Sequence, residues 1–389
     1  MKLFSKQIIG NKTLFKFLSF VYSKKIINKR TTRYLKFYFF NIIKTFRDFK
    51  TYKYEITHYF YLCNILVLKK FEDGEFIYYY LFNRLIKKIS IEKYLKKRFF
   101  RCIGDNYDYA YILNANSGEI YLFLTYLLDA LIKKDNAKKP ILIATKKYHV
   151  DLIKMICPEI PYILTSRFYT NIKKEHFEIN NTKFQVIFTN KHFDSVENLI
   201  INEPLGTAHY FEEMQKTLNI NPKGLFKKPT KNIIEAQESL LKKVKSIGLD
   251  LNNFVIIIPE ANSCRLLKNE FWRNLIVNLK KQGYDIFINI ALDKFSLDDV
   301  EYKTCYLTYA EMFSLACYSK KIYSLRSGLT ECLLDANVPM EVYYTPFRKF
   351  IAPKRIHSGF TILKIPNVNK SLIEEKIIDD ISICNNTCL

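Results

Sequence analysis

Several sequence motifs that would identify the type of reaction or binding site are missing from this chain of 389 residues. It has no Gly-x-Gly-x-x-Gly and no Gly-x-x-x-x-Gly-Lys-Ser/Thr, so neither a dinucleotide oxidoreductase nor a P-loop nucleotidase is indicated. The nine cysteines are scattered without a Cys-x-x-Cys pair, and no histidines cluster with them. A zinc site and a disulfide framework are therefore not supported, and reduced thiols in a cytosolic protein are expected.

Long apolar runs are also missing. No stretch reaches the roughly 18 apolar residues that a transmembrane helix needs. The start, residues 1–6, is not followed by an apolar core and a small-residue cleavage site, so we expect no signal peptide. No zinc finger, RNP motif or Gly-x-x-Gly loop is present, so nucleic acid is not an expected partner.

Positive charge is abundant and is concentrated at one end. Residues 1–105 carry 24 Lys/Arg against 7 Asp/Glu (+17), whereas the other residues carry 37 against 31 (+6), for a total of +23. Bases and aromatic residues are interleaved there, as in residues 14–25. Such segments bind anionic lipid, bind nucleic acid or form a solvated helical extension. We expect this region to hold the protein at the inner face of the cytoplasmic membrane.

After residue 105 short apolar strands alternate with helices. The strands are expected at 109–114, 141–145, 162–164, 184–189, 254–258, 285–290, 321–325 and 341–344. Strands separated by ten to fifteen helical residues predict βαβ units and parallel sheets.

The expected fold is therefore α/β, with two Rossmann-like, doubly wound domains that face a cleft. They would span 106–225 and 226–370, behind a basic, mostly helical extension (1–105) and before a C-terminal helix and tail (371–389).

The first candidate site is the turn that follows the strand at 109–114. Its residue Glu119 could take a proton from an acceptor hydroxyl, or it could simply complement the dipole of the helix that starts there. We expect Asn116, Ser117 and Gly118 to contact the acceptor.

The second and third candidate sites follow strands of the second half. A loop after 254–258 offers amide, hydroxyl and cationic groups, and a Ser-Gly turn after 321–325 adds a guanidinium at a helix start. The structural alternatives are a solvated loop and a tight turn. Because neighbouring parallel strands bring both turns to one edge, we expect a phosphorylated, nucleotide-type ligand here. The donor-binding residues would be Asn262, Ser263, Arg265, Lys268, Arg326, Ser327, Gly328 and Leu329. No metal site is assigned.

The order of these segments, over residues 109–345, resembles the heptosyltransferase-like enzymes of glycosyltransferase family nine. Residues 112–120 with 127–131 are similar to the family's opening strand, Gly-Asp turn and Leu-rich helix, and 148–158 to its second helix. Further similar segments are His209–Met214, Ile258–Ala261 with Lys268 and Trp272, Leu307–Met312 and Ser324–Leu329. The chain has Glu119 for the family's Asp, Glu260 for a Gly, and Arg326-Ser327-Gly328 for Asp-Thr-Gly.

This resemblance implies a B-type, inverting glycosyltransferase that needs no metal or other cofactor. Glu119 would be the catalytic base, and the donor-binding residues would neutralise the leaving diphosphate of a nucleotide-diphosphate sugar. The acceptor would be a surface polysaccharide or a lipid-linked oligosaccharide. The alternatives are a non-catalytic basic protein that binds membranes or polyanions, and a nucleotide-sugar epimerase.

Overall fold

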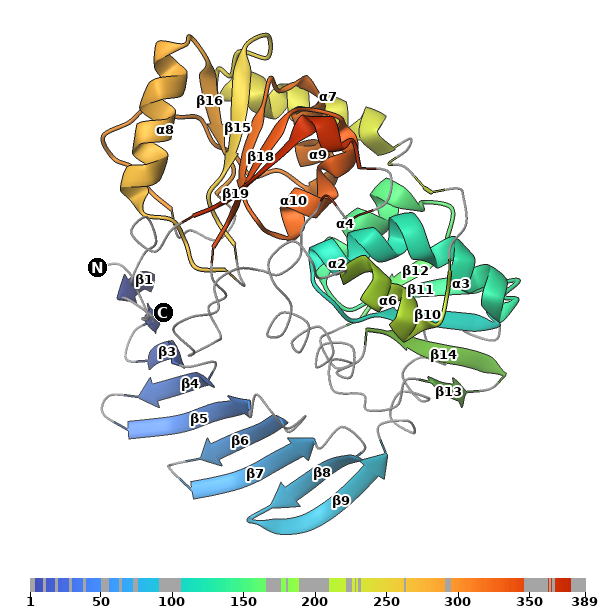
Figure 1. Cartoon of the computed structure of the whole chain (residues 1–389). Helices are drawn as coiled ribbons and strands as arrows, with labels where there is room; N and C mark the ends of the chain where they lie inside the picture. The colour runs from blue at the N-terminus through green and yellow to red at the C-terminus, as the bar shows by residue number, and fades with distance from the viewer. Residues whose placement is uncertain are drawn as a thin grey trace. The chain divides into compact units, whose positions relative to one another are not determined.

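The computed structural model describes most of the chain after residue 105 and much of the region before it. The described residues are 4–9, 12–17, 20–27, 30–37, 40–49, 56–62, 65–72, 76–90, 106–165, 176–179, 181–188, 210–221, 226–227, 229, 232–261, 264–290, 295–345, 363, 365 and 368–378. The chain divides into two compact units, 1–106 with 168–181 and 388–389, and 107–167 with 182–387 (Figure 1). Within the described ranges, no helix combines the length and hydropathy needed to cross a bilayer.

The N-terminal unit contains a nine-stranded sheet in which each strand pairs with the next along the chain. All the pairs are antiparallel. The strands are β1 (Phe4–Ile9), β2 (Lys12–Phe17), β3 (Phe20–Ile27), β4 (Arg30–Phe37), β5 (Phe40–Phe49), β6 (Ile56–Leu62), β7 (Ile65–Glu72), β8 (Phe76–Leu81) and β9 (Arg84–Ser90).

The prediction of a mostly helical extension over 1–105 is wrong for these residues. Their composition of Phe, Tyr, Ile, Val and Thr favours strands, because branched and aromatic side chains pack well on a pleated surface. Short pairs that contain glycine or asparagine, such as Gly10-Asn11 and Asn28-Lys29, stand in the sequence between consecutive strands. The sequence shows the basic amphipathic character of this region, whereas the regular spacing of these residue pairs is the signal that indicates hairpins.

The C-terminal unit contains two sheets. Within this unit the first has the strand order β12-β11-β10-β14, in which β10 pairs in parallel with both β11 and β14. Its strands are β10 (Tyr109–Leu113), β11 (Pro140–Ala144), β12 (Tyr162–Leu164) and β14 (Thr182–Ile187). β13 (His176–Ile179) belongs to the 168–181 segment of the N-terminal unit. Its helices are α2 (Ser117–Leu122), a π-helical segment (Phe123–Leu127), α3 (Leu128–Asp135), α4 (Lys147–Ile156) and α6 (Tyr210–Leu218).

The second sheet has the order β16-β15-β17-β18-β19, and all its neighbouring strands are parallel. Its strands are β15 (Phe254–Ile258), β16 (Asp285–Ile288), β17 (Ile322–Leu325), β18 (Met340–Tyr344) and β19 (Ile373–Ile377). The helices are α7 (Asn232–Ser246), α8 (Asn269–Lys281), α9 (Tyr309–Tyr318) and α10 (Gly328–Cys332), with 3₁₀ turns at Leu334–Ala336 and Lys370–Leu372. The prediction of an α/β fold with parallel sheets is confirmed.

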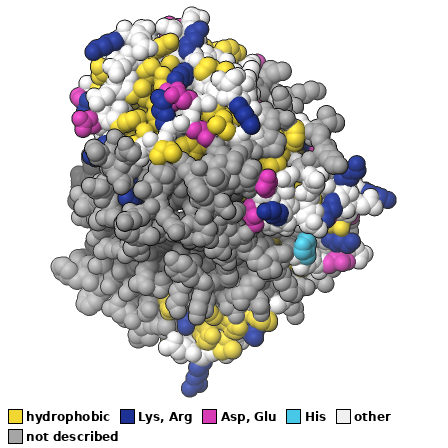
Figure 2. Space-filling view, in the orientation of Figure 1, with side chains coloured by type: hydrophobic (Ala, Val, Ile, Leu, Met, Phe, Trp, Pro, Cys, Tyr) yellow, Lys and Arg dark blue, Asp and Glu magenta, His cyan; other side chains and the backbone are white. Residues whose placement is uncertain are grey.

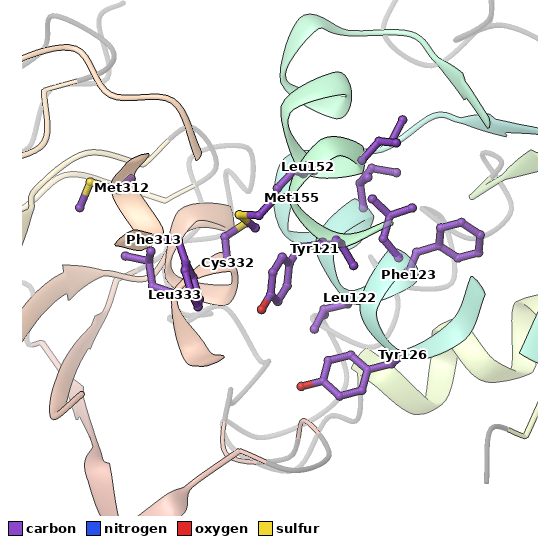
Figure 3. Packing of buried hydrophobic residues seen from close by; sticks show 14 of the residues in the cluster. Tyr121, Leu122, Phe123, Tyr126, Leu152, Met155, Met312, Phe313, Cys332 and Leu333 are labelled. Carbon is purple, nitrogen blue, oxygen red and sulfur yellow. The ribbon is translucent and has the colours of Figure 1, made fainter. Parts of the chain in front are cut away.

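Both faces of the second sheet are covered, which explains why β15 is an unbroken apolar run. Val255 and Ile257 pack in one buried cluster with Trp272 of α8. Phe254 and Ile256 belong to a second cluster with residues of α9. This second cluster also contains residues of α2 and α4, so a continuous core links the two halves of the unit (Figure 3).

The described part of the C-terminal segment forms a strand over 373–377 and not the helix predicted within 371–389. Its Glu and Lys residues favour a helix, but pairing with β18 overrides that preference. Lys376 and Lys321 both bind Glu341 of β18 across the sheet, at 2.6 and 2.7 Å. The domain division at 225/226 stays a prediction, since the described residues of both halves belong to one compact unit.

Candidate functional site

The three candidate turns follow β10, β15 and β17. β10 lies between β11 and β14, and β15 lies between β16 and β17. In each sheet the strand order therefore reverses beside these strands, and the crevice outside the carboxyl ends at such a point is where open α/β sheets bind ligands. The three turns therefore lie at or beside the points where the strand order reverses.

The turn after β10 and the turn after β17 are in direct contact. A Cβ atom added to Gly328 would lie 2.7 Å from the backbone nitrogen of Gly118 and 2.6 Å from the Oγ of Ser117. A Cβ added to Gly118 would lie 3.0 Å from the Cα of Gly328. Both positions are thus restricted to glycine by the close approach of two helix starts. Because nothing fits between the two glycines, a ligand would lie beside them.

Three charged side chains gather at this contact. Arg326 donates from Nη2 to Oε1 of Glu331 at 2.5 Å, and both residues are buried, with 9% and 3% of their surface exposed. The other oxygen of Glu331 lies only 1.7 Å from where a Cβ of residue 118 would be. Glu119, which is partly exposed, is close enough to act electrostatically on both partners of the pair. The site therefore holds two carboxylates and one guanidinium.

The surroundings set which of these groups titrates. Burial raises the pKa of Glu331 to about 7; Arg326 opposes this shift and Glu119 adds to it. For Arg326, burial alone would lower the pKa, but Glu331, Tyr344, Cys264 and Glu119 together hold it above its usual value. The guanidinium stays charged, so Glu331 is the member of the pair that takes up a proton.

Arg326 retains unused hydrogen-bonding capacity. Its Nε is buried and has no hydrogen-bond partner among the described residues. A buried donor of this kind costs about 1–3 kcal/mol when it stays unsatisfied. An anionic group that reached Arg326 would recover that cost, so this side chain is suited to bind a phosphate or carboxylate oxygen.

The turn after β10 is held by α4. The carbonyl of Ala115 accepts from Nζ of Lys146 at 2.8 Å and from Nε2 of His149 at 3.0 Å. Nδ1 of His149 accepts from the amide of Thr145, so the ring is the neutral Nε2–H tautomer. Burial also lowers the pKa of His149 to about 3, so the ring stays neutral. These bonds fix the backbone immediately before Asn116.

The turn after β17 is fixed by its own hydroxyls. The Oγ1 of Thr330 accepts from the amide of Ser327 at 3.0 Å and lies 2.8 Å from the Oγ of Ser324. Cys332 donates from its thiol to the carbonyl of Gly328 at 3.1 Å. Burial raises the pKa of that thiol well above its usual value, so Cys332 is not a nucleophile here. The amide of Ser327 thus already has a hydrogen-bond partner, whereas Nε of Arg326 has none among the described residues.

The structure brings some predicted residues together and separates others. Asn116, Ser117, Gly118, Glu119, Arg326, Ser327 and Gly328 lie in the two contacting turns. Leu329 packs on the buried core, and the carbonyl of Arg265 accepts from the hydroxyl of Thr345 at 2.6 Å. Asn262 and Ser263 lie outside the described residues.

Lys268 lines a different place. It borders a pocket of about 510 Å³ together with Phe271 of α8 and with Glu341, Tyr343 and Lys376 of the neighbouring strands. None of the lining residues belongs to the turns after β10 and β17. A phosphate role for Lys268 therefore stays a prediction, separate from the cluster around Arg326.

Two features of the site were not found from the sequence. The sequence predicts no role for Glu331, since an acidic residue in the first turn of a helix is ordinary. Tyr121 donates to Asp335 at 2.5 Å, which links α2 to the segment after α10. The residues are 214 positions apart, and no local pattern could have paired them. In the described part of the chain, no group of three or more His, Cys, Asp or Glu residues is placed to hold a metal ion.

No protein-family model and no curated protein matches this chain. Solved structures do. A glycosyl transferase family 9 protein from Veillonella parvula is 12% identical, with 60% of this chain and 80% of that chain covered and a TM-score of 0.43. The iron-containing dodecameric glycosyltransferase TibC from enterotoxigenic E. coli is 11% identical, with 78% and 70% covered and a TM-score of 0.40.

A further match is the E. coli heptosyltransferase WaaC with ADP-2-deoxy-2-fluoro heptose, at 11% identity, 61% and 89% coverage and a TM-score of 0.36. This chain is thus similar to solved family 9 glycosyltransferases, heptosyltransferases among them, and this is the family that its sequence resembles.

Proposed function

We propose that this protein is a B-type glycosyltransferase that moves a sugar from a nucleoside-diphosphate donor to a glycan or lipid-linked acceptor. The observation that carries the proposal is the convergence of Glu119 and Arg326. Glu119 follows β10, the strand at which the order of the first sheet reverses. Arg326 follows β17, which lies next to β15 where the order of the second sheet reverses. A proton acceptor and an anion-binding cation are the two groups that this transfer needs.

In the proposed reaction Glu119 takes the proton of an acceptor hydroxyl. The hydroxyl oxygen then forms a bond to the anomeric carbon of the donor sugar, while the bond from that carbon to the diphosphate oxygen breaks. The diphosphate leaves with the bonding electrons, and this single displacement inverts the anomeric configuration. Asn116, Ser117 and Gly118 would orient the acceptor beside Glu119.

Arg326 would stabilise the negative charge that develops on the leaving diphosphate. Its Nη2 is held by Glu331 and its Nε has no partner among the described residues, so the guanidinium is fixed in place and can still donate. Ser327, Gly328 and Leu329 would line the same side of the donor. Asn262, Ser263 and Arg265 would contact it from the loop after β15. The scheme assigns the neutralising charge to side chains and includes no metal step.

We also propose that the protein works at the inner face of the cytoplasmic membrane. This follows from the net charge of +17 on residues 1–105, which attracts an anionic lipid surface. A lipid-linked acceptor would be presented at the same surface.

The direct test of the donor site is thermal unfolding of the protein with UDP, GDP, ADP or CMP. A nucleotide at ~100 times its Kd stabilises the folded state by about 2.7 kcal/mol. One nucleoside diphosphate should raise the midpoint, and the corresponding nucleoside should not. Binding of a nucleotide sugar without transfer would instead favour an epimerase.

A further inference from the structure

One hairpin of the N-terminal unit ends in apolar side chains that face solvent. β8 and β9 are antiparallel and are joined by Phe82 and Asn83. Every residue from 81 to 88 is exposed. We call this segment the hairpin tip. Its large apolar side chains are Leu81 (38% exposed), Phe82 (60%), Leu85 (53%) and Ile86 (57%). A group of exposed apolar side chains at one point marks an interaction surface.

The turn itself does not explain the phenylalanine. Phe82 and Asn83 have φ angles of +44° and +64°, in the left-handed region. Two-residue hairpin turns of this kind prefer Asn, Asp or Gly at both positions, and a bulky residue there is strained. Phe82 thus opposes the local folding preference while exposing most of its ring. This combination points to a role for the ring outside the hairpin.

The charges around the tip are all of one sign. Residues 76–90 contain no Asp or Glu, and Arg84, Lys87 and Lys88 are exposed. Nζ of Lys88 lies 3.9 Å from the ring centroid of Phe76 and 5.3 Å from that of Tyr78. Lys88 therefore lies against aromatic rings behind the apolar tip. Figure 2 shows hydrophobic and basic side chains together where Figure 1 has β8 and β9.

An apolar tip backed by tyrosines and bases matches the layers of an anionic bilayer. Phe, Leu and Ile side chains bury at the boundary of the acyl chains, tyrosine rings lie at the headgroups, and Lys and Arg pair with lipid phosphates. The other occupant to consider is a second copy of the chain, because β9 is the edge strand of its sheet. Exposed lysines on an edge strand disfavour such pairing. The charge and the tip both favour lipid.

We propose that the hairpin tip, residues 81–88, inserts into the surface of an anionic membrane. This inference rests on the membrane association proposed above and names the element that carries it. It does not depend on the sugar-transfer chemistry. Phe82 and Ile86 anchor the tip, and Arg84, Lys87 and Lys88 hold it to anionic headgroups.

Flotation of the full chain with lipid vesicles tests the proposal. The vesicles contain phosphatidylcholine alone, or phosphatidylcholine with phosphatidylglycerol. Phe82→Asn is the informative variant, because Asn suits the left-handed backbone and replaces the aromatic ring with a small polar amide. We expect it to keep the elution volume and circular dichroism of the native protein but to bind anionic vesicles about tenfold more weakly. Lys87→Gln should weaken binding about fivefold.

Leu241→Ser is the matched control, since Leu241 is similarly exposed (52%) but lies on α7 of the other unit. It should float like the native protein. Equal flotation of Phe82→Asn and the native protein would overturn the proposal. So would loss of a concentration-dependent dimer in Phe82→Asn with vesicle binding unchanged, which would assign the tip to a second copy. Vesicle binding needs no nucleotide, so a failed nucleotide shift would leave this result intact.

Discussion

The contact between Gly118 and Gly328 can be tested by giving each residue one methyl group. In an ordinary first helical turn, Gly→Ala stabilises by about 0.5–1 kcal/mol. Here a Cβ at residue 118 would lie 1.7 Å from Oε2 and 2.8 Å from Cδ of Glu331. Glu331 would have to leave Arg326. Breaking a buried ion pair costs about 3–5 kcal/mol, so we expect Gly118→Ala to lose about 3 kcal/mol of unfolding free energy.

A second substitution separates this clash from general disruption. Glu331→Ala removes the obstructing atoms, so Gly118→Ala made in that background should cost only about 1 kcal/mol, for the remaining 3.0 Å approach to the Cα of Gly328. Gly328→Ala is the control. Its Cβ would meet the backbone nitrogen of Gly118, which cannot rotate away. It should cost about 1–3 kcal/mol with or without Glu331.

Denaturation in urea, followed by tryptophan fluorescence, measures these changes. Trp272 is the only tryptophan and is fully buried in the C-terminal unit, so its emission reports on that unit. The predicted coupling between residues 118 and 331 is about 2 kcal/mol, well above the usual additivity error. A neutral or stabilising Gly118→Ala would refute the contact, and with it the convergence of Glu119 and Arg326.

Two further results are expected from the same cluster. The pKa of Glu331 is raised from 4.5 to about 7, so folding favours its protonated form. The resulting stability is fully present below about pH 4.5 and falls by about 3 kcal/mol as the pH rises to about 7, and Glu331→Gln should flatten this fall in urea denaturation. Glu119→Gln should fold and bind the donor normally but lose turnover, measured as release of nucleoside diphosphate. Unchanged kcat in that variant would remove Glu119 from the mechanism.

Much of the C-terminal unit could be predicted from the sequence because its signals are local. Continuous apolar runs such as 254–258 predict strands that are covered on both faces. Gly283, which has a positive φ angle, predicts the end of α8. The turns after β15 and β17 were expected at one sheet edge because parallel neighbours impose it. These inferences need only periodicity and topology.

The remaining features depend on packing between distant segments. The contact of Gly118 with Gly328 and the bond from Tyr121 to Asp335 are set by how the two halves meet, which no window of sequence records. Residues 373–377 have helical composition but pair with β18. In the N-terminal unit, lysines interrupt the alternation, so amphipathic strands were mistaken for helices.

The central claim is that the cluster around Arg326 binds the diphosphate of a nucleotide sugar. Calorimetric titration of nucleoside diphosphates into the native protein and into Arg326→Gln/Glu331→Gln tests it most directly. The double change removes the cation without leaving Glu331 as an unpaired buried charge. We predict that one nucleoside diphosphate binds the native protein and binds the variant at least about tenfold more weakly. Equal binding by both proteins, or none by the native protein, would contradict the account.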